Sequence, residues 1–108
     1  MTAIVSISLP SAGRITVVDT DGSPTLKLVG EIDAENVAAH ERIRPSLPEI
    51  SAVDLSEVTF LSSSAVSFLI RQTRPIRERG QLPAIVGVSA HARRVLELLG
   101  AVRLFAPL

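Results

Sequence analysis

The first third of the chain alternates apolar and polar residues, a period that predicts β-strands. Residues 14–19 (R-I-T-V-V-D) are rich in β-branched side chains, and residues 25–29 alternate in the same way. Turns rich in Gly, Pro, Asp or Ser are expected at 19–24 and at 10–13. Residues 1–7 also alternate and indicate an edge strand, not a signal peptide. This region therefore predicts two or three short antiparallel strands.

After Asp33 the apolar spacing becomes helical. A helix is expected from Ala34 to about Arg44, with Asp33 as its capping residue. The spacing predicts that Val37, Ala38 and Ile43 form its apolar face.

A short strand is expected at 52–55, followed by a helix that begins in the serine run at 62–64. Pro75 interrupts the apolar pattern of this helix and predicts a kink, or an end near Thr73. The residues expected to face the core are Ala65, Val66, Leu69, Ile70, Thr73 and Ile76.

A buried strand is expected at 83–88. Ser89 then caps a third helix with apolar Ala92, Val95, Leu96 and Leu99, and Gly100 ends it in a left-handed conformation. A last strand is predicted at 102–105. Strands that alternate with helices predict an α/β fold: one domain over residues 1–108, with a mixed sheet of four to six strands and about three helices packed on it.

Composition and charge narrow the range of functions. Lys plus Arg and Asp plus Glu both number 11, so the formal net charge is zero, which argues against nucleic acid as the main partner. The chain has no cysteine, as fits a reducing cytoplasm, and this excludes disulfides and thiolate metal sites. No apolar run approaches the roughly 20 residues of a membrane span, so no direct membrane insertion is expected.

Candidate catalytic residues are few. His40 and His91 lie among charged neighbours on predicted helices and are expected to be solvated, and Lys27 lies mid-strand. No phosphate-binding glycine loop or nucleophile motif is present. We therefore predict no catalytic residues, no metal site and no cofactor. A hydrolase that uses one of the serines stays open as an alternative, although no base for it is identifiable.

The serine run is the most informative segment. Helix capping explains one or two of Ser62, Ser63 and Ser64. At least one hydroxyl is then left beside unpaired backbone N–H groups at the positive end of a helix dipole. Such a position tolerates an added phosphate.

Three motifs carry a resemblance to a known family. Residues 54–66 read D-L-S-E-V-T-F-L-S-S-S-A-V, which is similar to the family segment D-x-S-x-V-x-F-h-D-S-S-G-h, where h is apolar. Residues 30–33 (G-E-I-D) resemble the motif G-E-L-D, and residues 95–105 resemble the usual last helix and strand. In this order, they make the chain resemble a STAS domain of the anti-sigma-factor-antagonist type.

This resemblance implies a bacterial, cytoplasmic binding module that regulates sigma-factor-dependent transcription and is not an enzyme. Its partner would be an anti-sigma factor with serine kinase activity, bound by the unphosphorylated domain and released on phosphorylation. Mapped onto this chain, Ser64 is the phospho-acceptor, with Ser63 as second choice. The partner-binding residues implied are Asp33, Ser62, Ser63, Ala65 and Ser67.

Two residues depart from the family pattern. Ser62 stands where the family usually has Asp, and Ala65 stands where it usually has Gly. A degenerate motif is compatible with an alternative function, a STAS accessory subunit of a membrane (lipid/ABC-type) transport complex without a phosphorylation switch.

Overall fold

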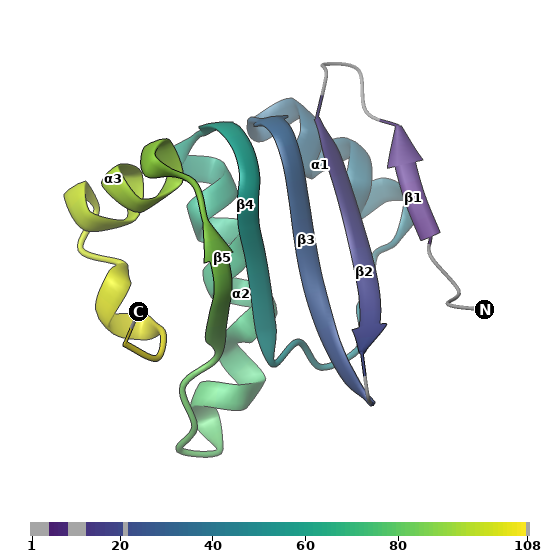
Figure 1. Cartoon of the computed structure of the whole chain (residues 1–108). Coiled ribbons are helices and arrows are strands. Elements are labelled where there is room, and N and C mark those ends of the chain that lie inside the picture. The colour runs from purple at the N-terminus through teal and green to yellow at the C-terminus, as the bar shows by residue number, and fades with distance from the viewer. Residues whose placement is uncertain (1–4, 9–12, 21, 108) are drawn as a thin grey trace.

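The fold is a mixed α/β domain (Figure 1). The computed structural model describes residues 5–8, 13–20 and 22–107. Its strands are β1 (Val5–Ser8), β2 (Arg14–Thr20), β3 (Ser23–Ile32), β4 (Ala52–Leu61) and β5 (Ala84–Val88). Its helices are α1 (Ala34–Ile43), α2 (Ser63–Glu78), α3 (Ala90–Leu98) and the short 3₁₀ helix η1 (Val102–Leu104). The predicted turn at Pro10–Ala12 lies outside the described residues.

The five strands form one sheet in chain order, β1-β2-β3-β4-β5. The β1–β2 and β2–β3 pairs are antiparallel, whereas β3–β4 and β4–β5 are parallel. The change follows from the connections, since a tight turn joins β2 to β3 while helices join the later strands. This arrangement confirms the predicted mixed sheet and its three α-helices.

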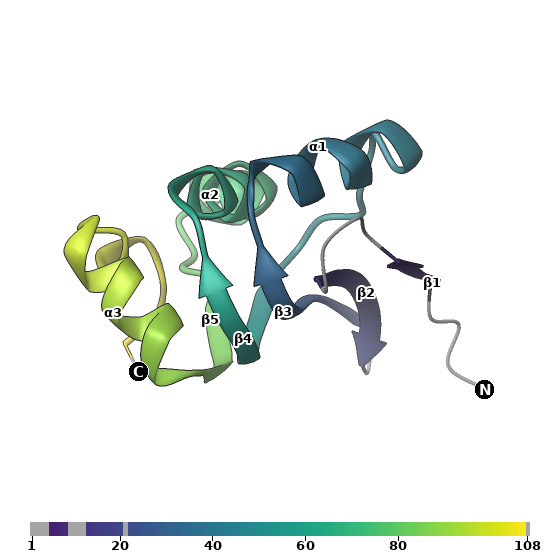
Figure 2. The same ribbon diagram turned by 90° about the horizontal axis from the view of Figure 1, so that it is seen from above.

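Helices cover only one face of the sheet. Seen from above, α1 and α2 lie over that face and α3 lies beside β5 (Figure 2). The core fills the space between sheet and helices with Leu26 and Leu28 of β3, Val53 and Leu55 of β4, and Phe68 of α2, all 0% exposed. Burying these side chains supplies the main favourable free energy of folding.

The predicted core face of α2 is confirmed, since Val66 and Leu69 are buried and Ile70 is half-buried. The helix does not end near Thr73 but continues through Pro75 to Glu78. Pro75 has no N–H to donate to the Arg71 carbonyl one turn earlier, and side chains add hydrogen bonds to the two carbonyls that precede it. Thr73 Oγ1 donates to the Leu69 carbonyl at 2.7 Å, and the Arg77 guanidinium donates to the Ile70 carbonyl.

Two predictions about helix α1 are wrong. Its buried face is made by Asn36, Val37, Ala39 and His40, and Ile43 is exposed. His40 is 1% exposed, not solvated, and its ring meets the ring of Phe68 edge-on at 5.7 Å. The charged neighbours of His40 suggested solvation, but the stripe of residues 36, 37 and 40 is one helical face.

The predicted last strand is also wrong, because residues 102–104 form η1. Gly100 has the predicted left-handed conformation, with φ 68°. The segment that follows Gly100 forms its hydrogen bonds internally. The N–H of Leu104 donates to the Ala101 carbonyl, and the N–H of Phe105 donates to the Val102 carbonyl. Arg77 donates to the Leu104 carbonyl at 3.4 Å, so a side chain of α2 holds this segment.

Strands β4 and β5 also differ from expectation. β4 extends to Leu61, well beyond the predicted end at residue 55. β5 is the last strand of the sheet order and is half-exposed along its length, with Val86 61% exposed, where a buried strand was predicted.

Candidate functional site

The ends of two neighbouring parallel strands bring Asp33 and Ser62 to the same edge of the sheet. Ile32 and Leu61 are paired in register, and the N–H of Ser62 donates to the Ile32 carbonyl at 3.0 Å. Each next residue, Asp33 and Ser62, is the N-cap of a helix. The topology therefore brings the two motifs, residues 30–33 and 54–66, together.

Asp33 has the capping role that its position predicts. Its Oδ1 accepts the N–H of Asn36 at 2.9 Å, and Asn36 Oδ1 accepts the N–H of Asp33 at 3.0 Å. This reciprocal pair satisfies two backbone donors.

Ser62 caps α2. Its Oγ accepts the N–H of Ala65 at 3.1 Å, and its carbonyl accepts the N–H of Val66 at the same distance. One hydroxyl of the serine run is therefore engaged in helix capping.

The other two serines lie in the first turn of α2 and are exposed. Neither the Ser63 nor the Ser64 hydroxyl has a hydrogen-bond partner among the described residues. No acidic side chain stands in this turn. The prediction that Ser64 lies near the surface at a helix N-terminus is confirmed.

Ala65 and Ser67 differ sharply in exposure. Ala65 is 0% exposed, so its methyl group belongs to the core, whereas Ser67 is exposed. Any influence of Ala65 on a partner would act through the packing of this turn.

His91 also belongs to this site, although the sequence predicted a solvated side chain. The ring is half-buried, stacks on Phe60 at 5.7 Å and accepts the N–H of Leu61 on Nε2 at 3.2 Å. It thus ties the first turn of α3 to the residue before the α2 cap. No local sequence pattern predicts this contact, because His91 and Leu61 are 30 residues apart in the chain.

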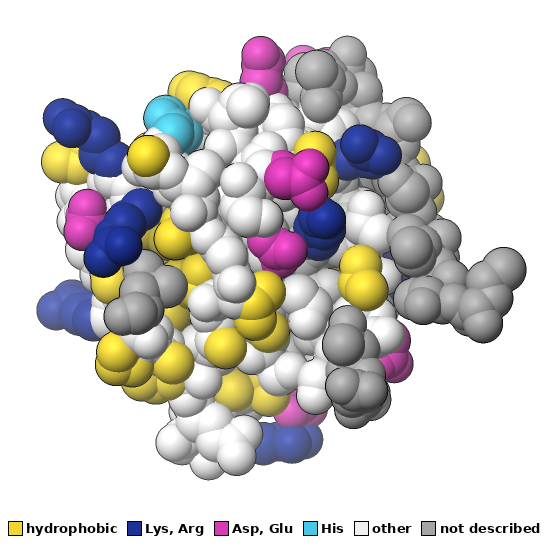
Figure 3. All heavy atoms as spheres, in the orientation of Figure 1, with side chains coloured by type: hydrophobic (Ala, Val, Ile, Leu, Met, Phe, Trp, Pro, Cys, Tyr) yellow, Lys and Arg dark blue, Asp and Glu magenta, His cyan; other side chains and the backbone are white. Residues whose placement is uncertain are grey.

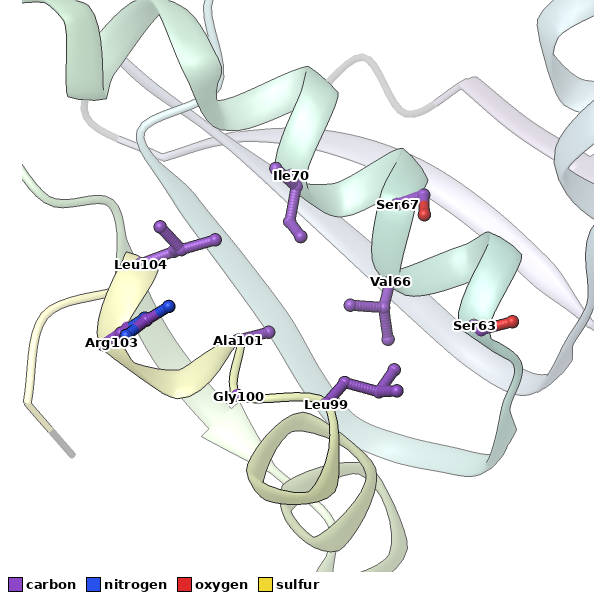
Figure 4. Close-up of a pocket in the computed structure, with 9 residues that line it drawn as sticks. All are labelled: Ser63, Val66, Ser67, Ile70, Leu99, Gly100, Ala101, Arg103 and Leu104. Atoms are coloured by element: carbon purple, nitrogen blue, oxygen red, sulfur yellow. The ribbon is translucent and has the colours of Figure 1, made fainter.

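A groove runs between α2 and the segment from the end of α3 through η1 (Figure 4). Val66 and Ile70 of α2 face Leu99 and Leu104 across it. Ser63 lies toward one end and Arg103 toward the other. Its volume is about 350 Å³.

The uncovered face of the sheet carries a second hollow, of about 340 Å³, lined by Lys27, Asp54, Val18, Thr25 and Val86. Lys27 Nζ lies 2.9 Å from the Glu57 carboxylate, which raises the pKa of Lys27 above its usual value. Asp54 accepts the hydroxyl of Ser56 at 2.7 Å. Both charged groups are thus engaged with neighbouring side chains.

Among the residues described, no group of three His, Cys, Asp or Glu side chains could hold a metal ion. In the same part of the chain, no helix is long and apolar enough to cross a membrane.

A comparison with known families decides the assignment. The family model described as "Mlab, STAS domain" matches residues 15–106. The chain belongs to the STAS domain family. No match was found among curated proteins. STAS domains are binding and regulatory modules that mediate protein–protein interactions, and in this STAS domain the serine run and the groove are both displayed on the surface.

Proposed function

We propose that this STAS domain is an anti-sigma factor antagonist that acts in the cytoplasm and binds a partner with serine kinase activity. The partner binds the first turn of α2, and phosphorylation of Ser64 releases it. The observation that carries this proposal is the exposed Ser64 hydroxyl at the N-terminus of α2.

The three serines have different positions. Ser62 caps the helix and Ser63 lines the groove, so Ser64 is the exposed serine with neither placement. The kinase would transfer the γ-phosphoryl group of ATP to Ser64 Oγ, with the hydroxyl proton going to a kinase base and ADP leaving.

A phosphate on Ser64 alters the charge of the docking surface. It adds about −1.5 to −2 charges, and the helix dipole offsets only roughly 0.3–1 kcal/mol of the cost at an exposed site. The added charge stays compatible with the fold of the domain but opposes an acidic or apolar partner surface.

The test begins with capture of partners by the tagged full chain from the source cell, identified by mass spectrometry. A captured ATP-binding protein is then incubated with the chain and labelled ATP. We expect label on Ser64, lost in Ser64→Ala and kept in the matched control Ser63→Ala. We also expect Ser64→Ala to bind as wild type and Ser64→Glu to bind about tenfold more weakly.

Equal binding of the Ala and Glu variants, or label on a different residue, would contradict the proposed switch. Binding would then depend on the surface of α2 without phosphorylation.

A second candidate is an accessory subunit of a membrane transport complex, in which the same surface contacts an ATPase. Ser62 favours it, since a neutral capping serine stands where the antagonist motif has Asp. This candidate predicts stable capture of a transport ATPase and no phosphate incorporation by it.

A further inference from the structure

The groove between α2 and the α3–η1 segment is apolar along its walls and has no acidic side chain in its lining. Arg103 is its one charged lining residue and is exposed. At the opposite end lies Ser63, in the first turn of α2, where the helix dipole is positive. Both ends therefore favour negative charge.

Charge is divided unevenly along the chain. Residues 1–62 contain four basic and nine acidic side chains, whereas residues 63–108 contain seven basic and two acidic ones. Every residue that lines the groove comes from the basic part. The neutral total thus conceals a cationic half built from α2, β5, α3 and η1.

Several of these arginines lack a carboxylate partner. The arginines of this half that form ion pairs are Arg71, Arg79 and Arg93. Within the described residues, Arg74, Arg94 and Arg103 have no carboxylate within ion-pair distance. Figure 3, which shows the uncovered face of the sheet, has basic side chains along the edge of the molecule where α3 and η1 lie, next to hydrophobic side chains.

Arg77 adds to the charge at this end without being available to a ligand. Its guanidinium bonds the Thr73 hydroxyl and the Leu104 carbonyl, and burial, followed by the nearby Arg74, lowers the pKa of Arg77. Cations therefore cluster where the groove ends at Arg103.

We infer that the groove binds a peptide segment of the partner protein in which apolar residues are flanked by acidic ones. Apolar side chains enter between Val66, Ile70 and Leu99, while carboxylates meet Arg103 and the first turn of α2. In naming what the partner presents, this inference rests on the proposed function. A concave surface suits an inserted segment better than it suits the flat surface of a lipid bilayer.

The same charges explain the direction of the proposed switch. A phosphate on Ser64 stands beside Ser63, at the end of the groove where an acidic residue would dock. The phosphate would repel the acidic residue of the peptide, because two groups at adjacent positions lie within the screening length of about 8 Å at physiological salt. Phosphorylation would then expel the acidic segment without altering the apolar walls.

The test selects peptides from a random display library on the immobilised, unphosphorylated full chain. We expect enrichment of peptides that combine acidic and apolar residues. Nuclear magnetic resonance should show that the enriched peptide shifts the methyl signals of Val66, Ile70, Leu99 and Leu104. Fluorescence anisotropy should show binding about tenfold weaker for Arg103→Glu.

The matched control is Arg14→Glu, which makes the same charge change at an exposed arginine on β2, away from the groove lining, and should bind as wild type. Ser64→Glu, which places a negative charge beside this end of the groove, should bind more weakly.

Three results would overturn the inference: no enrichment, enrichment of basic peptides, or signal shifts confined to the uncovered face of the sheet. Sedimentation with phosphatidylserine vesicles that Arg103→Glu abolishes, without any peptide enrichment, would assign this face to an anionic membrane instead. Each of these results leaves phosphorylation of Ser64 to be judged separately by label incorporation.

Discussion

The Nε2 atom of His91 accepts the backbone N–H of Leu61 at 3.2 Å, so a side chain of α3 holds the residue that precedes the α2 cap. His91→Phe keeps a ring against Phe60 but removes the acceptor. Leaving a partly buried donor unpaired costs about 1 kcal/mol or more. We expect a lower free energy of unfolding in urea and faster hydrogen exchange at the Leu61 amide.

The control for this prediction is Phe60→Ala, which removes the stacked ring and keeps the acceptor. If His91→Phe leaves the Leu61 exchange rate at the wild-type value, the hydrogen bond does not protect this amide.

Because Ser62 caps α2, it should contribute more to the free energy of unfolding than Ser63 or Ser64. Ser62→Ala removes the acceptor for the Ala65 N–H and should lower the free energy of unfolding by about 1 kcal/mol. Ser63→Ala and Ser64→Ala, at exposed positions without partners, should each change it by less than about 0.5 kcal/mol. Urea denaturation of the three variants checks this order, and equal losses would refute the assignment of Ser62 as the cap.

Restoring the family's acidic residue tests the departure at position 62. Asp is as good a cap as Ser, so Ser62→Asp should keep wild-type stability. A carboxylate accepts a hydrogen bond more strongly than a hydroxyl, and can orient the neighbouring Ser64. We therefore predict faster phosphate incorporation into Ser64 by the captured kinase. A rate that is unchanged or slower, in a time course on both proteins, would show that the native serine is not a handicap.

Buried His40 predicts a pH dependence of stability. Burial lowers the pKa of His40, Arg44 lowers it further, and Glu41 opposes them. Because the folded-state pKa lies below the unfolded value of about 6.5, the unfolded chain binds the proton more readily. The stability linked to His40 is therefore complete above the unfolded-state pKa. It is lost as the pH falls from there through the lower folded-state pKa.

Urea midpoints measured between about pH 8 and pH 5.5 should fall with pH in the wild type and less in His40→Leu. His91→Phe is the control and should keep the His40 contribution. An identical pH profile for His40→Leu and wild type would contradict the prediction.

The Arg77 guanidinium donates to Thr73 and Ile70 within α2 and to the Leu104 carbonyl of η1, so it connects the two helices. Arg77→Met keeps an apolar stem but loses these bonds, which should lower stability by about 1–2 kcal/mol and speed hydrogen exchange in residues 102–105. Arg79→Met is the matched control. It removes an exposed ion pair with Glu49, worth about 0–1 kcal/mol. Equal effects of the two variants would mean that the Arg77 bonds carry no stability.

Local signals predicted much of this fold. The N-caps Asp33 and Ser89 and the left-handed Gly100 follow from backbone chemistry within a few residues, and the serine run was located correctly at the start of a helix. These features depend on near neighbours, which a single sequence displays.

The features that were missed depend on tertiary contacts. His40 is buried because α1 packs on Phe68, and His91 meets Leu61 only when α3 folds against the end of β4. Residues 102–105 have strand-like composition, but the turn after Gly100 and the Arg77 bond give them a different conformation. The groove likewise joins residues 63–70 of α2 to residues 99–104, so no local pattern predicts it.

The order of the sheet, in which every strand pairs with its predecessor in the chain, has a consequence for biosynthesis. As the ribosome releases the polypeptide, each new strand finds its neighbour already made, and no earlier strand waits with an open edge for a distant segment. Short separations also keep the entropic cost of loop closure low. In the chain, α3 and η1 follow all five strands and complete both the His91 contact and the second wall of the groove, so the docking surface can form only after the whole sheet has been synthesised.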